Sequence, residues 1–312
     1  MLLNKKDVRI IFMGTPEFAV ASLEALLHAE FHIVAVVTAP DKPAGRGMAI
    51  HESAVKKIAV SKHIPVLQPV NLKDPVFLDQ LASYKAELQV VVAFRMLPEK
   101  VWNMPAWGTI NLHGSLLPQY RGAAPINWAI INGEIETGVT TFKLQHAIDT
   151  GNILLQDKIP ITEETTAGDL HDTMKMIGAS LLVKTIEDLL KGTLSEIPQV
   201  IRPGEIYKAA PKIHPADCKL NFQDTVENIH NRVRGLSPVP GAYTDLHGHK
   251  FKIYKTIKEI RTPDHLPGVP VSDGKTYLKF SCRNGYLICT EVQLEGKKRM
   301  DIESFLRGYR LP

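Results

Sequence analysis

The first 190 residues show two alternating patterns of apolar positions. Runs of adjacent, mostly β-branched apolar residues lie at 8–13, 33–37 and 89–94, and each run predicts a buried strand. After the first two runs, apolar residues recur every three or four positions, which predicts amphipathic helices. Their apolar positions are Ala19, Leu23, Leu26 and Leu27, then Ala54, Val55, Ile58 and Ala59. This alternation predicts an α/β domain, with a parallel sheet covered by helices on both faces.

The pattern changes in the last third of the chain. A long amphipathic helix is predicted up to Gly192, and the segment with four prolines at 195–215 is typical of a linker. One more helix is predicted around 226–233. Short alternating runs at 251–254, 277–280 and 286–289 then suit a small β-barrel. We therefore predict a first domain at 1–194, a linker at 195–211 and a second domain at 212–312.

Composition is that of an ordinary globular protein, with 312 residues, 44% of them hydrophobic. The start of the chain has no apolar core typical of a secretory signal, and no apolar run is long enough to span a bilayer. The three cysteines, Cys218, Cys282 and Cys289, lack metal-type spacing. We therefore expect a cytoplasmic protein with reduced thiols, no structural metal and no membrane partner.

Charge is distributed unevenly along the chain. Residues 208–312 carry 18 Lys and Arg against 11 Asp and Glu, a net charge of +7, whereas the remainder carries −3. A basic module beside a mildly acidic one suggests a polyanionic partner for the C-terminal part. A solvated basic surface explains the same numbers equally well, so charge alone leaves both interpretations open.

Gly14, Thr15 and Pro16 follow the first predicted strand and lead into a helix. A dinucleotide site requires three glycines in the pattern G-x-G-x-x-G, and only Gly14 is present. We interpret this glycine as part of a tight turn between strand and helix, and we exclude a nicotinamide-binding site.

Candidate catalytic side chains occur at Asn111, His113 and Asp149. If residues 110–112 end a strand, Asn111 and His113 point to the same face, where an amide and an imidazole can stabilise an oxyanion. Asp149 follows a predicted strand at 139–144, and a carboxylate near an imidazole orients the ring. Taken alone, a structural Asn, a surface His and an Asx turn before Gly151 explain these residues as well.

The surrounding motifs resemble those of the folate-dependent formyltransferases, and the resemblance covers the whole chain. It rests on NLHGSLLP at 111–118, YRGAAPI at 120–126, IDTG at 148–151, FMGTPEFA at 12–19, DKPAGRG at 41–47, LQPVNLKD at 67–74, NGEIETGVT at 132–140 and KLNF at 219–222. The combined pattern is far more specific than any of its parts.

The resemblance implies an architecture and a reaction. It implies a Rossmann-like parallel-sheet formyltransferase domain followed by a smaller OB-like β-barrel domain that binds tRNA. The formyl donor would be 10-formyltetrahydrofolate, and the acceptor would be the α-amine of methionine on initiator tRNA, for translation initiation. By the same resemblance, Asn111 would hold the formyl oxygen, His113 would stabilise the oxyanion, and Asp149 would help to remove the amine proton. We expect a monomer.

The resemblance also implies binding residues. The folate would lie along Ser115, Leu116, Leu117 and Pro118 and against Phe94, Met96 and Leu97. At 94–98 the chain departs from the family, which often has Tyr-Gly there, so side-chain contacts to the pterin differ. The polar segment 38–50 would reach the tRNA acceptor stem through Lys42 and Arg46, and the basic run Lys297, Lys298 and Arg299 would contact the tRNA backbone.

Three other functions are compatible with parts of the sequence. A sugar-nucleotide N-formyltransferase would share the motifs at 115–128 and 132–138 but would not need a basic second domain. A 10-formyltetrahydrofolate hydrolase would use water in place of the amine. A non-catalytic tRNA-binding module would not need Asn111, His113 and Asp149 together. Arg121 could meet the folate tail, nucleic acid or a local carboxylate.

Overall fold

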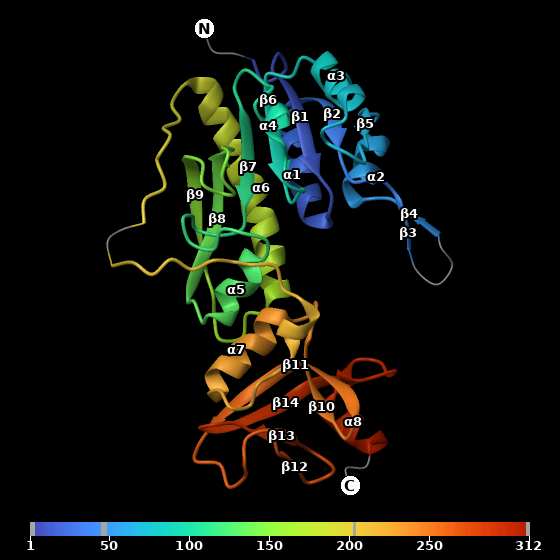
Figure 1. Cartoon of the computed structure of the whole chain (residues 1–312), viewed down its shortest axis with the longest axis vertical. Helices are drawn as coiled ribbons and strands as arrows, with labels where there is room; N and C mark the ends of the chain where they lie inside the picture. The colour runs from blue at the N-terminus through green and yellow to red at the C-terminus, as the bar shows by residue number, and fades with distance from the viewer. Residues whose placement is uncertain (1–3, 45–48, 202–203, 310–312) are drawn as a thin grey trace. The chain divides into compact units, whose positions relative to one another are not determined.

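The computed structural model describes residues 4–44, 49–201 and 204–309, which form two compact units. Each unit is assembled from three separate stretches of chain (Figure 1). The first unit contains Met1–Arg121, Gly138–Ile159 and Asp172–Ala209, and the second contains Gly122–Thr137, Pro160–His171 and Ala210–Pro312.

A seven-stranded sheet in the order β5-β2-β1-β6-β7-β8-β9 forms the centre of the first unit. Its strands are β1 (Arg9–Gly14), β2 (His32–Val37), β5 (Val66–Leu67), β6 (Leu88–Val92), β7 (Thr109–His113), β8 (Glu136–Lys143) and β9 (Ile153–Pro160). The first five strands in this order, β5, β2, β1, β6 and β7, run parallel to one another, which confirms the predicted parallel sheet. β8 pairs antiparallel with β7, because it enters the sheet at the end where β7 leaves it.

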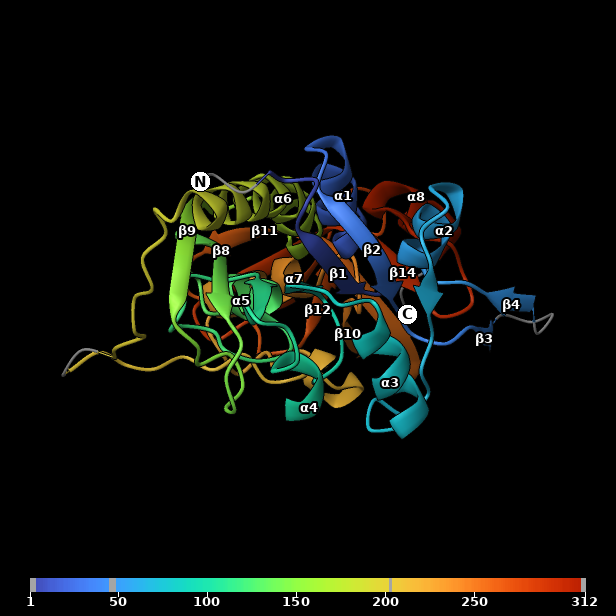
Figure 2. The same cartoon turned by 90° about the horizontal axis from the view of Figure 1, so that it is seen from above.

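Helices cover both faces of this sheet, as predicted. They are α1 (Glu17–His28), α2 (Ala54–Ser61), α3 (Pro75–Ser83), α4 (Glu99–Trp102) and α6 (Ala167–Lys191). Figure 2 shows α1 and α6 on one face and α3 and α4 on the other. Ile11 and Met13 of β1 pack with Phe77 of α3 and Val101 of α4, while Leu112 of β7 lies against Gly178 of α6. Within the described ranges, none of the helices combines the length and apolar character needed to cross a membrane.

Gly14 ends β1 where the chain turns into α1. A Cβ atom at this position would lie 2.7 Å from the Ala19 Cβ atom, 2.9 Å from Phe12 Cε1 and 3.0 Å from the Val92 carbonyl oxygen. The glycine therefore allows helix α1 to approach the sheet closely, which agrees with its interpretation as a tight turn.

Gly14→Ala should lower the free energy of unfolding by about 1–3 kcal/mol, because the added methyl group overpacks this junction. Guanidinium titration of the variant measures the change. Gly308→Ala is the matched control, since a Cβ atom there meets nothing within 4 Å. Equal stability of the two variants would contradict this account of Gly14.

The second unit is built on an antiparallel sheet in the order β10-β11-β14-β13-β12, with β15 paired to β14. Its elements are α5 (Pro125–Ile131), the 3-10 turn Pro215–Cys218, α7 (Val226–Leu236), β10 (Ala242–Leu246), β11 (His249–Ile260), β12 (Pro270–Ser272), β13 (Leu278–Ser281), β14 (Gly285–Leu294), β15 (Met300–Asp301) and α8 (Ile302–Gly308). The long strand β11 has register shifts around Lys255, which bend it. The predicted short strands therefore form one curved antiparallel sheet.

Helix α5 packs against α7 in this second unit. Asn127 Nδ2 donates to the Gly235 carbonyl at 2.8 Å, and a Cβ atom at Gly235 would lie 2.6 Å from Ile131. The buried Arg234 guanidinium donates to the carbonyls of Thr162 and Thr165 at 3.1 Å. Helix α7 thus holds together all three stretches of chain that make up the unit.

All three cysteines are free and buried. Burial raises the pKa of the Cys282 thiol to about 12 and that of Cys289 further still. These side chains therefore behave as apolar core groups of the second unit, not as reactive thiolates.

Candidate active site

Strand β7 positions Asn111 and His113 at its carboxyl end. Successive side chains of a strand point to opposite faces, and Leu112 faces α6, so Asn111 and His113 share the opposite face of the sheet. His113 is buried and Asn111 is half-buried. Within the described part of the chain, the Asn111 side chain forms no hydrogen bond, so its amide is available to a ligand.

The His113 ring is held at two points. Its Nε2 atom lies 2.8 Å from the Tyr120 carbonyl oxygen, and since a carbonyl only accepts, Nε2 carries a proton. The ring also packs edge-on against Phe142, with centroids 6.5 Å apart. These contacts fix the orientation of the imidazole and direct Nδ1 away from Tyr120.

Asp149 lies in the loop between β8 and β9, near the Nδ1 atom of His113. Its Oδ2 atom is 3.8 Å from His113 Nδ1, and the two side chains are only 13% and 7% exposed. This separation is longer than a hydrogen bond, and a shift of about 1 Å would close it. Asp149 also has a φ of 52°, a left-handed conformation that costs a non-glycine residue energy. The surrounding structure must therefore hold this loop in place.

The loop after His113 is fixed by side chains of β8 and β9. Thr140 Oγ1 donates to the Ser115 carbonyl at 2.6 Å and accepts from the Leu117 amide at 3.2 Å. Gln156 Nε2 donates to the Leu117 carbonyl at 3.0 Å. Leu117 is buried, whereas Leu116 and Pro118 are partly exposed. The loop therefore forms a rigid wall next to Asn111 and His113.

The segment 94–97 follows β6, which ends at Val92, two residues before the predicted end. Leu97 is buried in the core on the α3 face, Phe94 is half-buried, and Met96 is 74% exposed. Arg95 donates to the carbonyl oxygens of Pro69 and Val70 and lies over the Phe94 ring. Arg95 therefore anchors this loop to a neighbouring loop.

Arg121 and Gln199 are bonded to each other near the site, and only Gln199 was not singled out by the sequence. Arg121, for which the sequence left three kinds of partner open, donates from Nε and a terminal nitrogen to Gln199 Oε1, at 3.0 and 2.7 Å. Gln199 Nε2 in turn donates to the carbonyl oxygens of Asp149 and Gly151, at 2.9 and 2.7 Å. Gln199 lies in the proline-rich segment, and sequence patterns give no information on such distant pairs.

The expected nucleic-acid contacts fall on two separate segments of the chain, 38–50 and 297–299. Lys42 is exposed at the start of β3 (Lys42–Ala44), which forms a hairpin with β4 (Ala49–His51) inside the segment expected to be a loop. Arg46 lies outside the described residues. Lys297 and Lys298 are exposed, whereas Arg299 forms two bonds to Glu291, at 2.6 and 2.7 Å, and lies over the Tyr254 ring.

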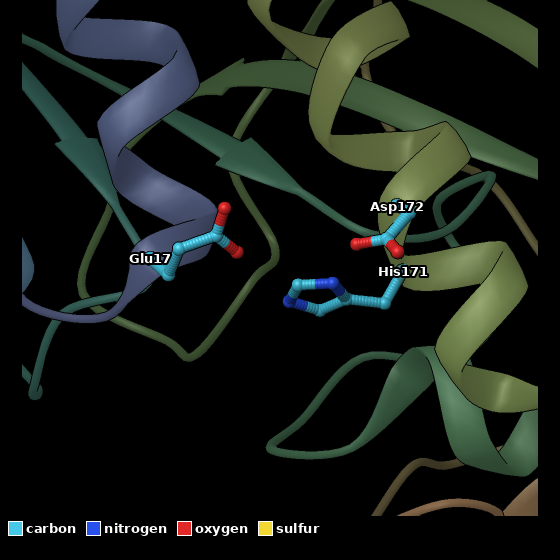
Figure 3. Close-up of side chains that lie close together, drawn as sticks. All are labelled: Glu17, His171 and Asp172. Carbon is cyan, nitrogen blue, oxygen red and sulfur yellow. The ribbon is translucent and has the colours of Figure 1, made fainter.

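Figure 3 shows acidic side chains at the start of α1 and on α6, together with the neighbouring His171. Lys175 Nζ lies 2.8 Å from Glu17 Oε1 and 3.2 Å from Asp172 Oδ1. The ammonium group supplies the positive charge that a cation would bring. This acidic pair therefore does not support a metal site.

Two protein-family models match the chain. The formyl transferase model matches residues 8–186, and the formyl transferase C-terminal domain model matches residues 212–310. The motifs that carry the family resemblance lie within these two matches.

Several curated proteins are similar over almost the whole chain. Methionyl-tRNA formyltransferase of Azobacteroides pseudotrichonymphae is 52% identical over 98% of this chain and 97% of its own length. The proteins of the same name from Bacteroides fragilis and Parabacteroides distasonis are 45% and 48% identical over 99% of the chain, and over 97% and 98% of their own lengths.

Solved structures share the fold at lower identity. An N-formyltransferase from Helicobacter canadensis, in complex with folinic acid and dTDP-3-aminofucose, has a TM-score of 0.67 and 23% identity, over 94% of this chain and all of that one. HypX from Aquifex aeolicus in complex with tetrahydrofolic acid has a TM-score of 0.64 and 17% identity, over 96% of this chain and 46% of that one.

Proposed function

The chain belongs to the formyl transferase family, and on that premise we propose that it transfers the formyl group of 10-formyltetrahydrofolate to the α-amine of methionine on initiator tRNA. The product, formylmethionyl-tRNA, serves translation initiation. The observation that carries the proposal is the group at the end of β7. There, the available Asn111 amide shares a face with a buried imidazole that has a carboxylate 3.8 Å from its Nδ1 atom.

Each member of this group has a chemical role suited to acyl transfer. Asn111 donates to the formyl oxygen and orients the formyl carbon toward the amine. His113 stabilises the negative charge that develops on that oxygen through a protonated Nδ1, because Nε2 already donates to the Tyr120 carbonyl. The His113 side chain is only 7% exposed, which strengthens this interaction. Asp149 accepts the proton that the amine loses.

The reaction conserves atoms and charge without an oxidant or reductant. The methionine nitrogen forms a bond to the formyl carbon, and the bond from that carbon to the folate nitrogen breaks. The proton released by the amine passes to the pair of Asp149 and His113 and then to the departing folate nitrogen. The products are formylmethionyl-tRNA and tetrahydrofolate.

The folate site that we propose lies between two loops of the first unit. The rigid 115–118 loop forms one wall, and the 94–97 loop forms the other. Leu97 and Leu117 are buried and shape the backbone, whereas Phe94, Met96 and Leu116 have exposed surface that can contact the pterin and its linker. Arg95, which stands where the family often has glycine, donates its guanidinium to the backbone carbonyls of Pro69 and Val70.

We propose that residues 212–312 form an OB-like tRNA-binding barrel, within a domain division of 1–194, 195–211 and 212–312. The curved sheet, the buried core and the net charge of +7 over residues 208–312 support this assignment. Lys42 and Arg46 of the first unit would contact the acceptor stem. Within the basic run, Lys297 and Lys298 are better candidates than Arg299, whose guanidinium is bonded to Glu291.

Lys297→Ala combined with Lys298→Ala should weaken tRNA binding and lower the slope of log Kd against log salt concentration by about 1 for each phosphate that is no longer neutralised. Arg299→Ala should change that slope little, because the guanidinium is already neutralised. Filter binding at several salt concentrations measures the slope for each protein. An unchanged slope in the double variant would remove this run from the interface.

One assay tests the proposed function directly. Purified protein is mixed with 10-formyltetrahydrofolate and one of three acceptors, namely methionyl-initiator tRNA, an amino-sugar nucleotide or water alone. Transfer of the formyl group to methionyl-tRNA is expected. Transfer only to the amino sugar, or release of formate alone, would replace the proposal with one of the two alternative reactions.

We further propose that the protein acts as a monomer in the cytoplasm, where its tRNA acceptor is available. Sedimentation of the purified protein tests the first statement, since a stable dimer would have twice the mass of 34.7 kDa.

A further inference from the structure

We propose that Gln199 is a positioning residue for the reaction, which holds the Asp149 loop beside His113. The inference rests on the proposed function, because it assigns Gln199 a role through Asp149. It also assigns part of the proline-rich segment to the active site.

The segment 196–199 runs beside the turn between β8 and β9. Glu196 Oε1 lies 2.5 Å from Lys143 Nζ, and its Oε2 atom accepts from Asn152 Nδ2 at 3.1 Å. Ile197 exchanges two backbone hydrogen bonds with Ile153, at 2.8 and 2.9 Å. This segment is therefore fixed against the β8–β9 turn and does not behave as a passive linker there.

Gln199 uses its whole side-chain amide in this arrangement. The NH₂ group donates to the carbonyl oxygens of Asp149 and Gly151, and Oε1 accepts two bonds from Arg121. A glutamine is needed for this combination, because one end must donate to carbonyls while the other accepts from a guanidinium. Arg121 keeps the amide from rotating, since its two donors require the oxygen on their side.

The Asp149 loop requires such support. Asp149 adopts a left-handed conformation, at a φ of 52°, which is uncommon for residues other than glycine. Gly151 is packed so tightly that a Cβ atom would lie 1.6 Å from the Lys143 carbonyl oxygen. Two bonds from one glutamine, on either side of Thr150, hold this turn. A displacement of about 1 Å in a catalytic group can cost roughly 100-fold in rate.

Gln199→Leu should therefore lower kcat for formyl transfer about 10- to 100-fold, with the KM values of both substrates within threefold of the wild type. Gln199→Glu should have a similar effect, because it keeps the acceptor for Arg121 but loses the donors to the Asp149 loop. Glu196→Gln is the matched control in the same segment. It weakens the interaction with Lys143 without touching Asp149, and its kcat should stay within twofold.

A double-mutant cycle separates positioning from a general structural effect. If Gln199 acts through the carboxylate, Gln199→Leu in an Asp149→Asn background should lower kcat less than threefold further. Full additivity, or an equal loss of kcat in Glu196→Gln, would overturn the inference. A wild-type protein that does not formylate methionyl-tRNA would instead refute the proposed function, so the two failures are distinguishable.

Discussion

His113→Ala should lower kcat for formylation of methionyl-tRNA by about 100- to 1,000-fold. Loss of one preorganised donor to an oxyanion typically costs about 2.7–4 kcal/mol of transition-state stabilisation. His113 is buried and its orientation is fixed by Tyr120 and Phe142, so solvent cannot readily replace it. Single-turnover kinetics with saturating 10-formyltetrahydrofolate measure the chemical step without interference from tRNA release.

The His113 variant also loses a structural bond. The Tyr120 carbonyl loses its bond from His113 Nε2, at a cost of about 1–3 kcal/mol in stability, so thermal unfolding must be measured in parallel. His113→Gln retains a donor of similar reach and should recover much of the stability but little of the rate. His28→Ala, at the exposed end of α1, is the control that should leave kcat unchanged. Turnover within threefold of wild type in a folded His113→Ala protein would contradict the assigned role.

Asp149→Asn should lower kcat by about 100-fold while the loop keeps its shape. Asparagine has nearly the same size as aspartate and is among the residues that tolerate a positive φ best, so the backbone conformation at 52° is preserved. What is lost is the negative charge 3.8 Å from the imidazole and a carboxylate that can accept a proton. The KM for each substrate should change little, because Asn111 and the loops proposed to bind folate are untouched.

The control for this substitution is Asp157→Asn, at an exposed position on β9. It makes the same chemical change away from His113 and should retain full activity. If the two variants had equal turnover, Asp149 would have no part in proton transfer. A lower turnover in Asp149→Asn with a raised KM for tRNA would assign it to acceptor binding instead.

Local patterns were sufficient to predict most of the first unit. Runs of adjacent apolar residues identified β1, β2 and β6. Apolar residues that recur every three or four positions identified α1, α2 and α6, because this spacing follows directly from helix geometry. The shared face of Asn111 and His113 follows from the same rule. Their catalytic roles remain a prediction, although the structure does bring Asp149 next to His113.

Contacts between distant residues were not predictable in this way. Arg121 and Gln199 are 78 positions apart, and nothing near either residue indicates the other. The four prolines of 195–215 favour a linker, but they carry no information on whether the segment is bonded to the sheet. Similarly, the hairpin of β3 and β4 lies in a Gly- and Pro-rich stretch whose composition favours a loop.

The order in which the chain is synthesised gives the α5–α7 contact a consequence for folding in the cell. Helix α5 emerges about 100 residues before its partner α7 is complete. At roughly 5–20 residues per second, its packing face stays uncovered for about 5–20 s. The second unit therefore cannot be completed by local folding as each segment leaves the ribosome, and a nascent chain stalled before residue 226 should be bound by chaperones more strongly than the finished protein.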